Sequence, residues 1–189
     1  MTQMKGIYAL LIELPESEEI SVGRLGPIAF PRGFYAYVGS ALNGIEPRVN
    51  YHLRKNKKPR WHIDYLLGEA SIKRIVLYET EGRLECILAQ ALSKEFPSIP
   101  GFGSSDCKCQ SHLYFECGSA KLEEETVKAI ELPARVMSPD NFLSSSGCGR
   151  IGGRSELNLS HAWFILLHRK GALISNPHQE RRSIRPTWG

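Results

Sequence analysis

The chain has 189 residues, of which 42% are hydrophobic and 23% charged, and its formal net charge is +4. These are ordinary values for a globular protein and supply enough apolar material for one core, so we expect one main domain. They exclude a membrane-spanning chain, because the longest strongly apolar run, residues 162–167, is far shorter than the ~20 residues that cross a bilayer.

The first half of the chain alternates between strand and helix signals. An apolar run at residues 5–14, ended by Pro15, predicts a buried strand. Residues 20–30 predict short strand pieces joined by a turn, and residues 34–39 predict another strand with Tyr35 and Tyr37 on one face. Two helices are expected next, over residues 46–56 and 62–69.

The second half continues with a strand at residues 72–79, a helix at 82–95 that Pro97 ends, a loop at 98–111, a strand at 112–116 and a helix at 120–132. This order predicts an α/β (α+β) fold with a small central antiparallel or mixed sheet flanked by helices. We place the domain at residues 1–137. Residues 138–189 are expected to form a linker and tail, with disorder left open, because residues 144–155 are small, polar and rich in glycine.

Cysteine usage indicates the compartment. The chain has five cysteines, an odd number, and the apolar part of residues 1–14 is too short and interrupted for a secretory signal peptide. We therefore expect a reducing, cytoplasmic setting. Cys107 and Cys109, with His112 and Cys117, also permit a zinc site, but C-x-C is tighter than the common C-x2–4-C spacing. Plain thiols in a loop are the favoured interpretation, and zinc is the alternative.

A basic run at residues 47–60 contains six cationic side chains and no acid. They are Arg48, Arg54, Lys55, Lys57, Lys58 and Arg60. Such a run suits the phosphate backbone of a nucleic acid, and a solvated helix face is the alternative. We assign nucleic-acid binding to the last five of these and to His62, which begins the second predicted helix.

Several short motifs occur in a fixed order along the same region. They are Gly6-Ile7-Tyr8 in the first strand, Tyr37-Val38-Gly39 in the later one, Arg48 and His52 one helical turn apart, and Leu84-Glu85 in the third helix. Over about residues 5–116 this set resembles the GIY-YIG nuclease superfamily, and more closely its small stand-alone Uri-type endonucleases. The resemblance implies a GIY-YIG-like fold and a metal-dependent endonuclease that hydrolyses DNA, with structure-selective cutting in DNA repair as one option.

The resemblance also implies a role for each motif residue. Tyr8 would be the general base that deprotonates the attacking water, although a phenol with a pKa of about 10 needs help at neutral pH. Tyr37 would position water or phosphate, and Gly39 would let the chain approach the phosphate. Arg48 would stabilise charge on the scissile phosphate, and His52 would pass a proton or contact phosphate. Packing roles in a sheet or on a helix surface are the alternatives.

Glu85 matches the single carboxylate that holds the metal in that superfamily, Mg²⁺ or Mn²⁺. Glu81 competes for this role, but the apolar neighbours of Glu85 favour an inward side chain. The usual asparagine after the metal-binding helix is missing, and Ser105, Asp106 or His112 could replace it. A non-catalytic nucleic-acid-binding module is the alternative function. RNA is not excluded as the substrate, and the oligomeric state is left open.

Overall fold

A computed structural model describes residues 3–146. These residues fall within the first of the two units into which the chain divides, Met1–Gly149. Most of the predicted linker and tail, residues 147–189, lies outside the described residues.

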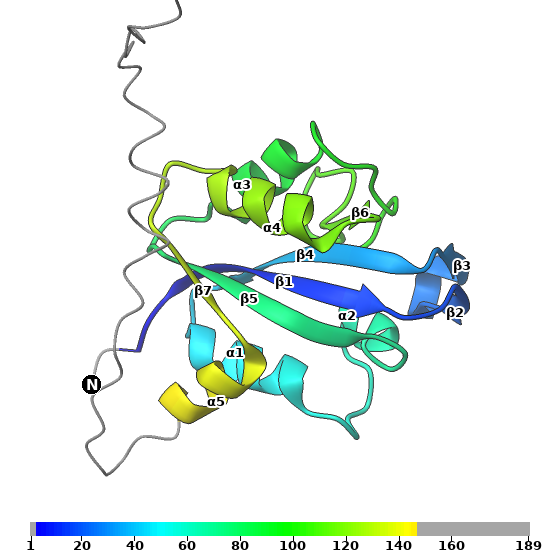
Figure 1. Ribbon diagram of the computed structural model, residues 1–189, viewed down its shortest axis with the longest axis horizontal. Helices are drawn as coiled ribbons and strands as arrows, with labels where there is room; N and C mark the ends of the chain where they lie inside the picture. Colours follow the sequence, from blue (N-terminus) through cyan, green and yellow to red (C-terminus); the bar gives the residue numbers. More distant parts are fainter. Residues whose placement is uncertain (1–2, 147–189) are drawn as a thin grey trace, which may run out of the picture. The chain divides into compact units, whose positions relative to one another are not determined.

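The first unit is built on a five-stranded sheet (Figure 1) in the order β6-β4-β1-β5-β7. Its strands are β1 Gly6–Leu14, β4 Gly33–Ala41, β5 Ser71–Glu79, β6 Leu113–Glu116 and β7 Ala134–Met137. All its paired strands are antiparallel, so the predicted α+β class with a small central sheet is confirmed. The central place of β1 follows from its sequence, because a strand that is apolar on both faces needs cover on both.

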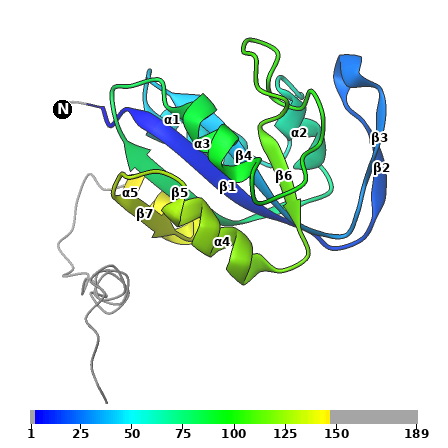
Figure 2. The ribbon, with the colours of Figure 1, turned by 90° about the horizontal axis from the view of Figure 1, so that it is seen from above.

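A two-stranded hairpin accounts for the glycine-bearing stretch after β1. It consists of β2 Glu18–Ser21 and β3 Pro27–Phe30, with the short 3-10 turn η1 Gly23–Leu25 between them. Figure 2 shows that the hairpin extends beyond one end of the main sheet. The short strand pieces predicted here are confirmed.

Helices cover both faces of the sheet, as Figures 1 and 2 show. They are α1 Ile45–Leu53, α2 His62–Leu66, α3 Glu85–Leu92, α4 Ser119–Lys128 and α5 Pro139–Ser146. The alternation along β1 divides the core accordingly. Tyr8, Leu10 and Ile12 join the apolar cluster with α1, α2 and α5, while Ile7, Ala9 and Leu11 join the cluster with α3 and α4.

Two elements were not predicted from the sequence. Strand β7 is a half-exposed edge strand with no clean alternation of apolar and polar residues, which is the signal that predicts strands. Helix α5 is held by packing, because Phe142 is buried in the core cluster of the α1 and α2 face. No helix within residues 3–146 is long and apolar enough to cross a membrane.

Candidate functional site

A buried tyrosine–histidine pair joins the centre of the sheet to α1. The Tyr8 hydroxyl lies 2.8 Å from His52 Nε2, and the two residues are 1% and 3% exposed. In the β1–β4 register Tyr8 is opposite Gly39, and a Cβ at Gly39 would lie 2.4 Å from the tyrosine hydroxyl. Gly39 therefore makes room for the Tyr8 ring, a role that the sequence did not suggest.

Asp64 stands behind the histidine and was not singled out from the sequence. Its Oδ1 lies 3.8 Å from His52 Nδ1, and its Oδ2 accepts hydrogen bonds of 2.9 Å from the backbone N–H groups of Arg60 and Trp61. Lys57 forms an ion pair with Oδ1 at 3.0 Å. The sequence could have indicated Asp64, because an acidic residue in the first turn of a helix can cap that helix through its side chain, as Asp64 does in α2.

Burial sets the protonation states of this group. Burial raises the pKa of Tyr8 well above its ordinary value, and the nearby Arg48 lowers it only in part. Burial also lowers the pKa of His52. Burial alone would raise the pKa of Asp64, but the contact with His52 and the backbone hydrogen bonds hold it well below its usual range. At neutral pH the group therefore comprises a phenol, a neutral imidazole and a carboxylate.

Tyr37 and Arg48 complete this neighbourhood. Tyr37 packs edge-on against His52, with ring centroids 6.2 Å apart, and is 8% exposed. Burial raises its pKa, and Arg48 again acts in the opposite direction. The structure thus brings Tyr8, Tyr37, Arg48 and His52 together.

A surface rich in arginine, lysine and aromatic rings adjoins the pair. The guanidinium groups of Arg48 and Arg60 lie 4.5 and 5.2 Å from the centre of the Trp61 ring. Tyr51 packs on the edge of the same tryptophan, and Lys57 lies over Tyr51 at 4.8 Å. We call this the Trp61 surface.

The predicted nucleic-acid-binding residues divide into two groups. Arg54, Lys55, Lys58 and Arg60 are exposed. Lys57 is turned toward Asp64. His62 accepts a hydrogen bond from the backbone N–H of Gly103, so it holds the loop that follows α3.

Glu85 is the first residue of α3 and is half-buried. Its Oε2 is buried and has no hydrogen-bond partner among the described residues. Burial lowers the pKa of the nearby His112, and the charges of Asp106 and Glu85 act in the opposite direction. A Cβ built at Gly103 would lie 3.2 Å from the Cβ of His112 and 3.0 Å from the Tyr37 ring. Asp106 acts on the pKa of both His112 and Tyr37. An unpartnered carboxylate oxygen is a suitable ligand for a hard divalent cation, so the residues present fit such an ion.

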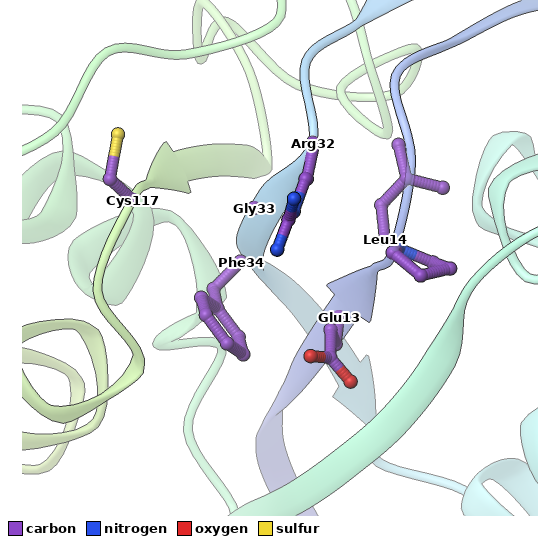
Figure 3. A pocket seen from close by; sticks show the side chains of 7 residues that line it. Glu13, Leu14, Arg32, Gly33, Phe34 and Cys117 are labelled. Carbon is purple, nitrogen blue, oxygen red and sulfur yellow. The ribbon is translucent and has the colours of Figure 1, made fainter.

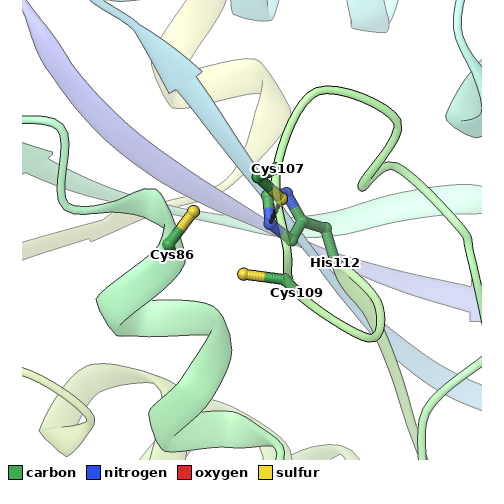
Figure 4. Close-up of side chains that lie close together, drawn as sticks. All are labelled: Cys86, Cys107, Cys109 and His112. Carbon is green, nitrogen blue, oxygen red and sulfur yellow. Dashed lines mark hydrogen bonds between the residues drawn. The ribbon is translucent and has the colours of Figure 1, made fainter.

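A second group of potential metal ligands lies beside Glu85 (Figure 4). Ligand atoms of Cys86, Cys107, Cys109 and His112 all lie within 4.8 Å of one another. Cys86 comes from α3 and the other three from the loop before β6, so spacing along the sequence did not reveal Cys86 as a member. Burial raises the pKa of the Cys109 thiol to about 12. The described part of the chain therefore contains a group that could hold a metal ion.

Cys117 is not part of this group. It is exposed and lines a separate pocket of about 280 Å³, with Glu13, Arg32 and Phe34 (Figure 3). Its side chain contributes nothing to the four-residue group, and it makes a matched control for experiments on the other cysteines.

Comparisons with known proteins change the expected family. The family model described as "Domain of unknown function DUF123" matches residues 7–134, which is more than half of the chain. This is a different family from the GIY-YIG nucleases, for which no match is found, so the predicted membership of that superfamily and of its Uri-type members is wrong. The motifs that suggested it are short, and chance can supply such tripeptides. No curated protein and no solved structure matches the chain.

Proposed function

We infer the function from the site, because the chain belongs to the DUF123 family, whose description gives no function. We propose that the protein is a metal-dependent endonuclease that hydrolyses phosphodiester bonds in DNA. The observation that carries the proposal is the 2.8 Å contact between the Tyr8 hydroxyl and His52 Nε2, next to Arg48 and the Trp61 surface.

The pair offers a route for one proton. In the proposed reaction, the Tyr8 oxygen accepts a proton from the attacking water while the phenol proton passes to His52 Nε2. The raised pKa of Tyr8 disfavours a free phenolate, so the two transfers have to be coupled. The imidazolium that forms faces Asp64, whose carboxylate stays ionised at neutral pH and stabilises the new charge. The water oxygen bonds to phosphorus as the bond to the leaving oxygen breaks. The leaving oxygen takes up a proton from solvent, and His52 then releases its proton to solvent, which restores the neutral pair.

The neighbouring charges would bind the phosphate. Arg48 offers a planar set of donors that stays charged and suits phosphate oxygens. The exposed Arg54, Lys55, Lys58 and Arg60 would contact the backbone on either side, and such contacts position a nucleic acid without specifying its sequence. Glu85 would hold Mg²⁺ or Mn²⁺, which when bound neutralises charge on the phosphate. Structure-selective cutting in DNA repair, in a cytoplasmic setting, belongs to the same proposal.

A non-catalytic nucleic-acid-binding module is the second candidate function. It is favoured by one observation, the burial of Tyr8, whose exposure of 1% leaves the hydroxyl little access to water. In this case the Tyr8–His52 contact would be a hydrogen bond of the core, and the Trp61 surface would bind DNA or RNA through its charges and rings.

The test is cleavage of a labelled pool of single-stranded, duplex, nicked, flapped and branched DNA, with an RNA set in parallel, in Mg²⁺ or Mn²⁺. We expect metal-dependent cutting of DNA. Tyr8→Phe should lower the rate by roughly 10²–10⁴-fold, the usual contribution of general base catalysis. Glu85→Ala should abolish cutting.

Matched variants control for loss of folding. Tyr35→Phe removes another buried hydroxyl on the same face of the sheet. This hydroxyl donates a hydrogen bond to the Pro31 carbonyl and not to His52, so the variant should keep full activity. Glu81→Ala removes an exposed carboxylate near the start of α3 and should also be active. Salt-sensitive binding without cutting in any metal would reject the endonuclease and support the binding module. Preferred cutting of RNA would correct the substrate.

A further inference from the structure

We propose that Cys86, Cys107, Cys109 and His112 form a structural zinc site that fastens the loop before β6 to the first turn of α3. The proposal does not depend on nuclease activity. It rests on the convergence of three thiols and one imidazole from two separate segments, which no simple sequence spacing records.

The distances suit a tetrahedral ion. Zinc bonds of about 2.3 Å to sulfur and about 2.0 Å to nitrogen require ligand atoms roughly 3.5–3.8 Å apart. Cys107 Sγ and His112 Nε2 are already 3.4 Å apart, and all pairs in the group are within 4.8 Å. Small side-chain movements would therefore bring the four atoms into coordination. In Figure 4 the four side chains point toward one another from α3 and the loop.

The ligand types select the metal and its role. Three thiolates and one imidazole suit zinc, whereas Mg²⁺ and Ca²⁺ prefer oxygen ligands. Four protein ligands leave no open position for water or substrate, which is the pattern of structural rather than catalytic zinc. The group would thus be distinct from the proposed hard-cation ligand, Glu85, although Glu85 and Cys86 are adjacent in α3.

The surrounding backbone holds the ligands in place. The His112 carbonyl accepts a hydrogen bond from the Val38 N–H in β4, and the His112 N–H donates to the Phe102 carbonyl. The Cys107 N–H donates to the Ser104 carbonyl. The loop has no helix or strand between α3 and β6, and structureless loops of this length are uncommon in compact domains. An ion here would fix the loop, and with it the contact between Gly103 and His62.

The experiment measures zinc in protein purified without chelator, by mass spectrometry of the metal, together with cobalt(II) substitution. We expect about one zinc per chain. Replacement by Co²⁺ should give the absorption of a tetrahedral thiolate site, with ligand-field bands and sulfur-to-cobalt charge transfer. Cys109→Ser removes a direct ligand, so it should lower the zinc affinity by more than the roughly 10–100-fold that loss of a ligand's hydrogen-bond partner costs. The control is Cys117→Ser, which changes an exposed cysteine outside the group and should keep full zinc content.

Several outcomes would overturn the proposal. These are wild-type protein without stoichiometric zinc after zinc is supplied, a cobalt spectrum without thiolate bands, or equal zinc content in the Cys109→Ser and Cys117→Ser variants. A disulfide among the three cysteines, detected by alkylation and mass spectrometry, would do the same. If Cys109→Ser does not fold, the wild-type cobalt spectrum and stoichiometric zinc release by a thiol-reactive reagent decide instead.

The zinc and nuclease proposals can fail separately. EDTA would remove zinc as well as Mg²⁺. After EDTA treatment, Mg²⁺ is therefore added back first alone and then together with zinc, and cutting is measured after each addition. Full zinc content without cutting would reject the nuclease and keep the zinc site. Cutting by a protein that takes up no zinc would keep the nuclease and reject the zinc site.

Discussion

At the scale of single residues, Asp64 is the buried carboxylate that stands behind His52 in the candidate site. Its side chain is fully buried, and it contacts His52, Lys57, Tyr51 and two backbone N–H groups. A buried charge is tolerated only when paired and hydrogen-bonded, and these contacts meet that requirement. They also hold the pKa of Asp64 below its ordinary value of 3.8.

This predicts how stability depends on pH. The folded state has the lower pKa, so the contribution of the Asp64 carboxylate is fully present above about pH 4 and is lost as the pH falls toward the folded pKa. Asp64→Asn should lower the free energy of unfolding at pH 7 by about 1.5–3 kcal/mol, the range for hydrogen bonds to charged groups. The difference from wild type should shrink below about pH 4.

Urea denaturation of both proteins at pH 7, 5 and 3 checks this. Asp64 also acts on the pKa of His52, so the altered titration of the imidazole is part of the measured difference. The control is Glu13→Gln, which breaks a surface ion pair with Lys73 and should cost less than about 1 kcal/mol at every pH. An Asp64→Asn effect that is the same at pH 3 as at pH 7 would contradict the assignment.

At the scale of elements, the fit between β1 and β4 depends on Gly39. A Cβ there would lie 2.4 Å from Cζ and from the hydroxyl oxygen of Tyr8, and the tyrosine ring is enclosed and cannot simply rotate away. Gly39→Ala should therefore destabilise the protein by about 1–3 kcal/mol, as overpacking of a core does. It should also weaken cutting, because Tyr8 has to shift away from His52.

Unfolding of a double-mutant cycle tests this explanation. In a Tyr8→Ala background the clash is gone, so most of the cost of Gly39→Ala should disappear. Gly118→Ala is the control, because a Cβ at Gly118 meets no atom within 4 Å. Gly118 is the N-cap of α4, so the change should cost about 1 kcal/mol or less, and the same in both backgrounds. Equal costs of Gly39→Ala in both backgrounds would point to the strand itself rather than to the tyrosine.

The elements also show what the sequence could and could not predict. Apolar runs and turn residues predicted β1, β4, β5, β6 and the helices α1 to α4, because burial follows periodicity. The sequence could not predict β7 and α5, whose places depend on pairing with β5 and on the burial of Phe142. For the same reason it could not predict that Cys86 meets Cys107 and Cys109, or that Asp64 stands behind His52, since both contacts arise only when separate elements pack.

The family assignment was wrong for a related reason. Short motifs such as Gly6-Ile7-Tyr8 and Tyr37-Val38-Gly39 report on a strand and the residue after it, and many sheets provide that pattern. Tyr8 and Gly39 of these motifs still contact each other, and Tyr8 contacts His52. The chemistry proposed for them therefore depends on their geometry and not on membership of a named nuclease family.

At the scale of the whole molecule, the net charge of +4 is too small to attract a polyanion strongly from all sides. Binding would have to come from the local concentration of cations at residues 54–60, where four exposed side chains stand beside the Trp61 surface. Each phosphate that such a cation neutralises releases condensed counterions, which makes affinity fall with salt.

The dependence of DNA affinity on salt should therefore change with this segment. For the double variant Lys55→Gln/Lys58→Gln, the slope of log affinity against log salt should become shallower by up to about 1.8, at ~0.9 per phosphate contact for duplex DNA. Fluorescence anisotropy with labelled duplex at several salt concentrations measures the slope. Lys73→Gln/Lys94→Gln removes the same charge from two other exposed lysines and should leave the slope almost unchanged. If both double variants change the slope equally, binding follows net charge and residues 54–60 have no special place in it. If only the first does, the nucleic acid lies along the Trp61 surface, next to the buried Tyr8–His52 pair.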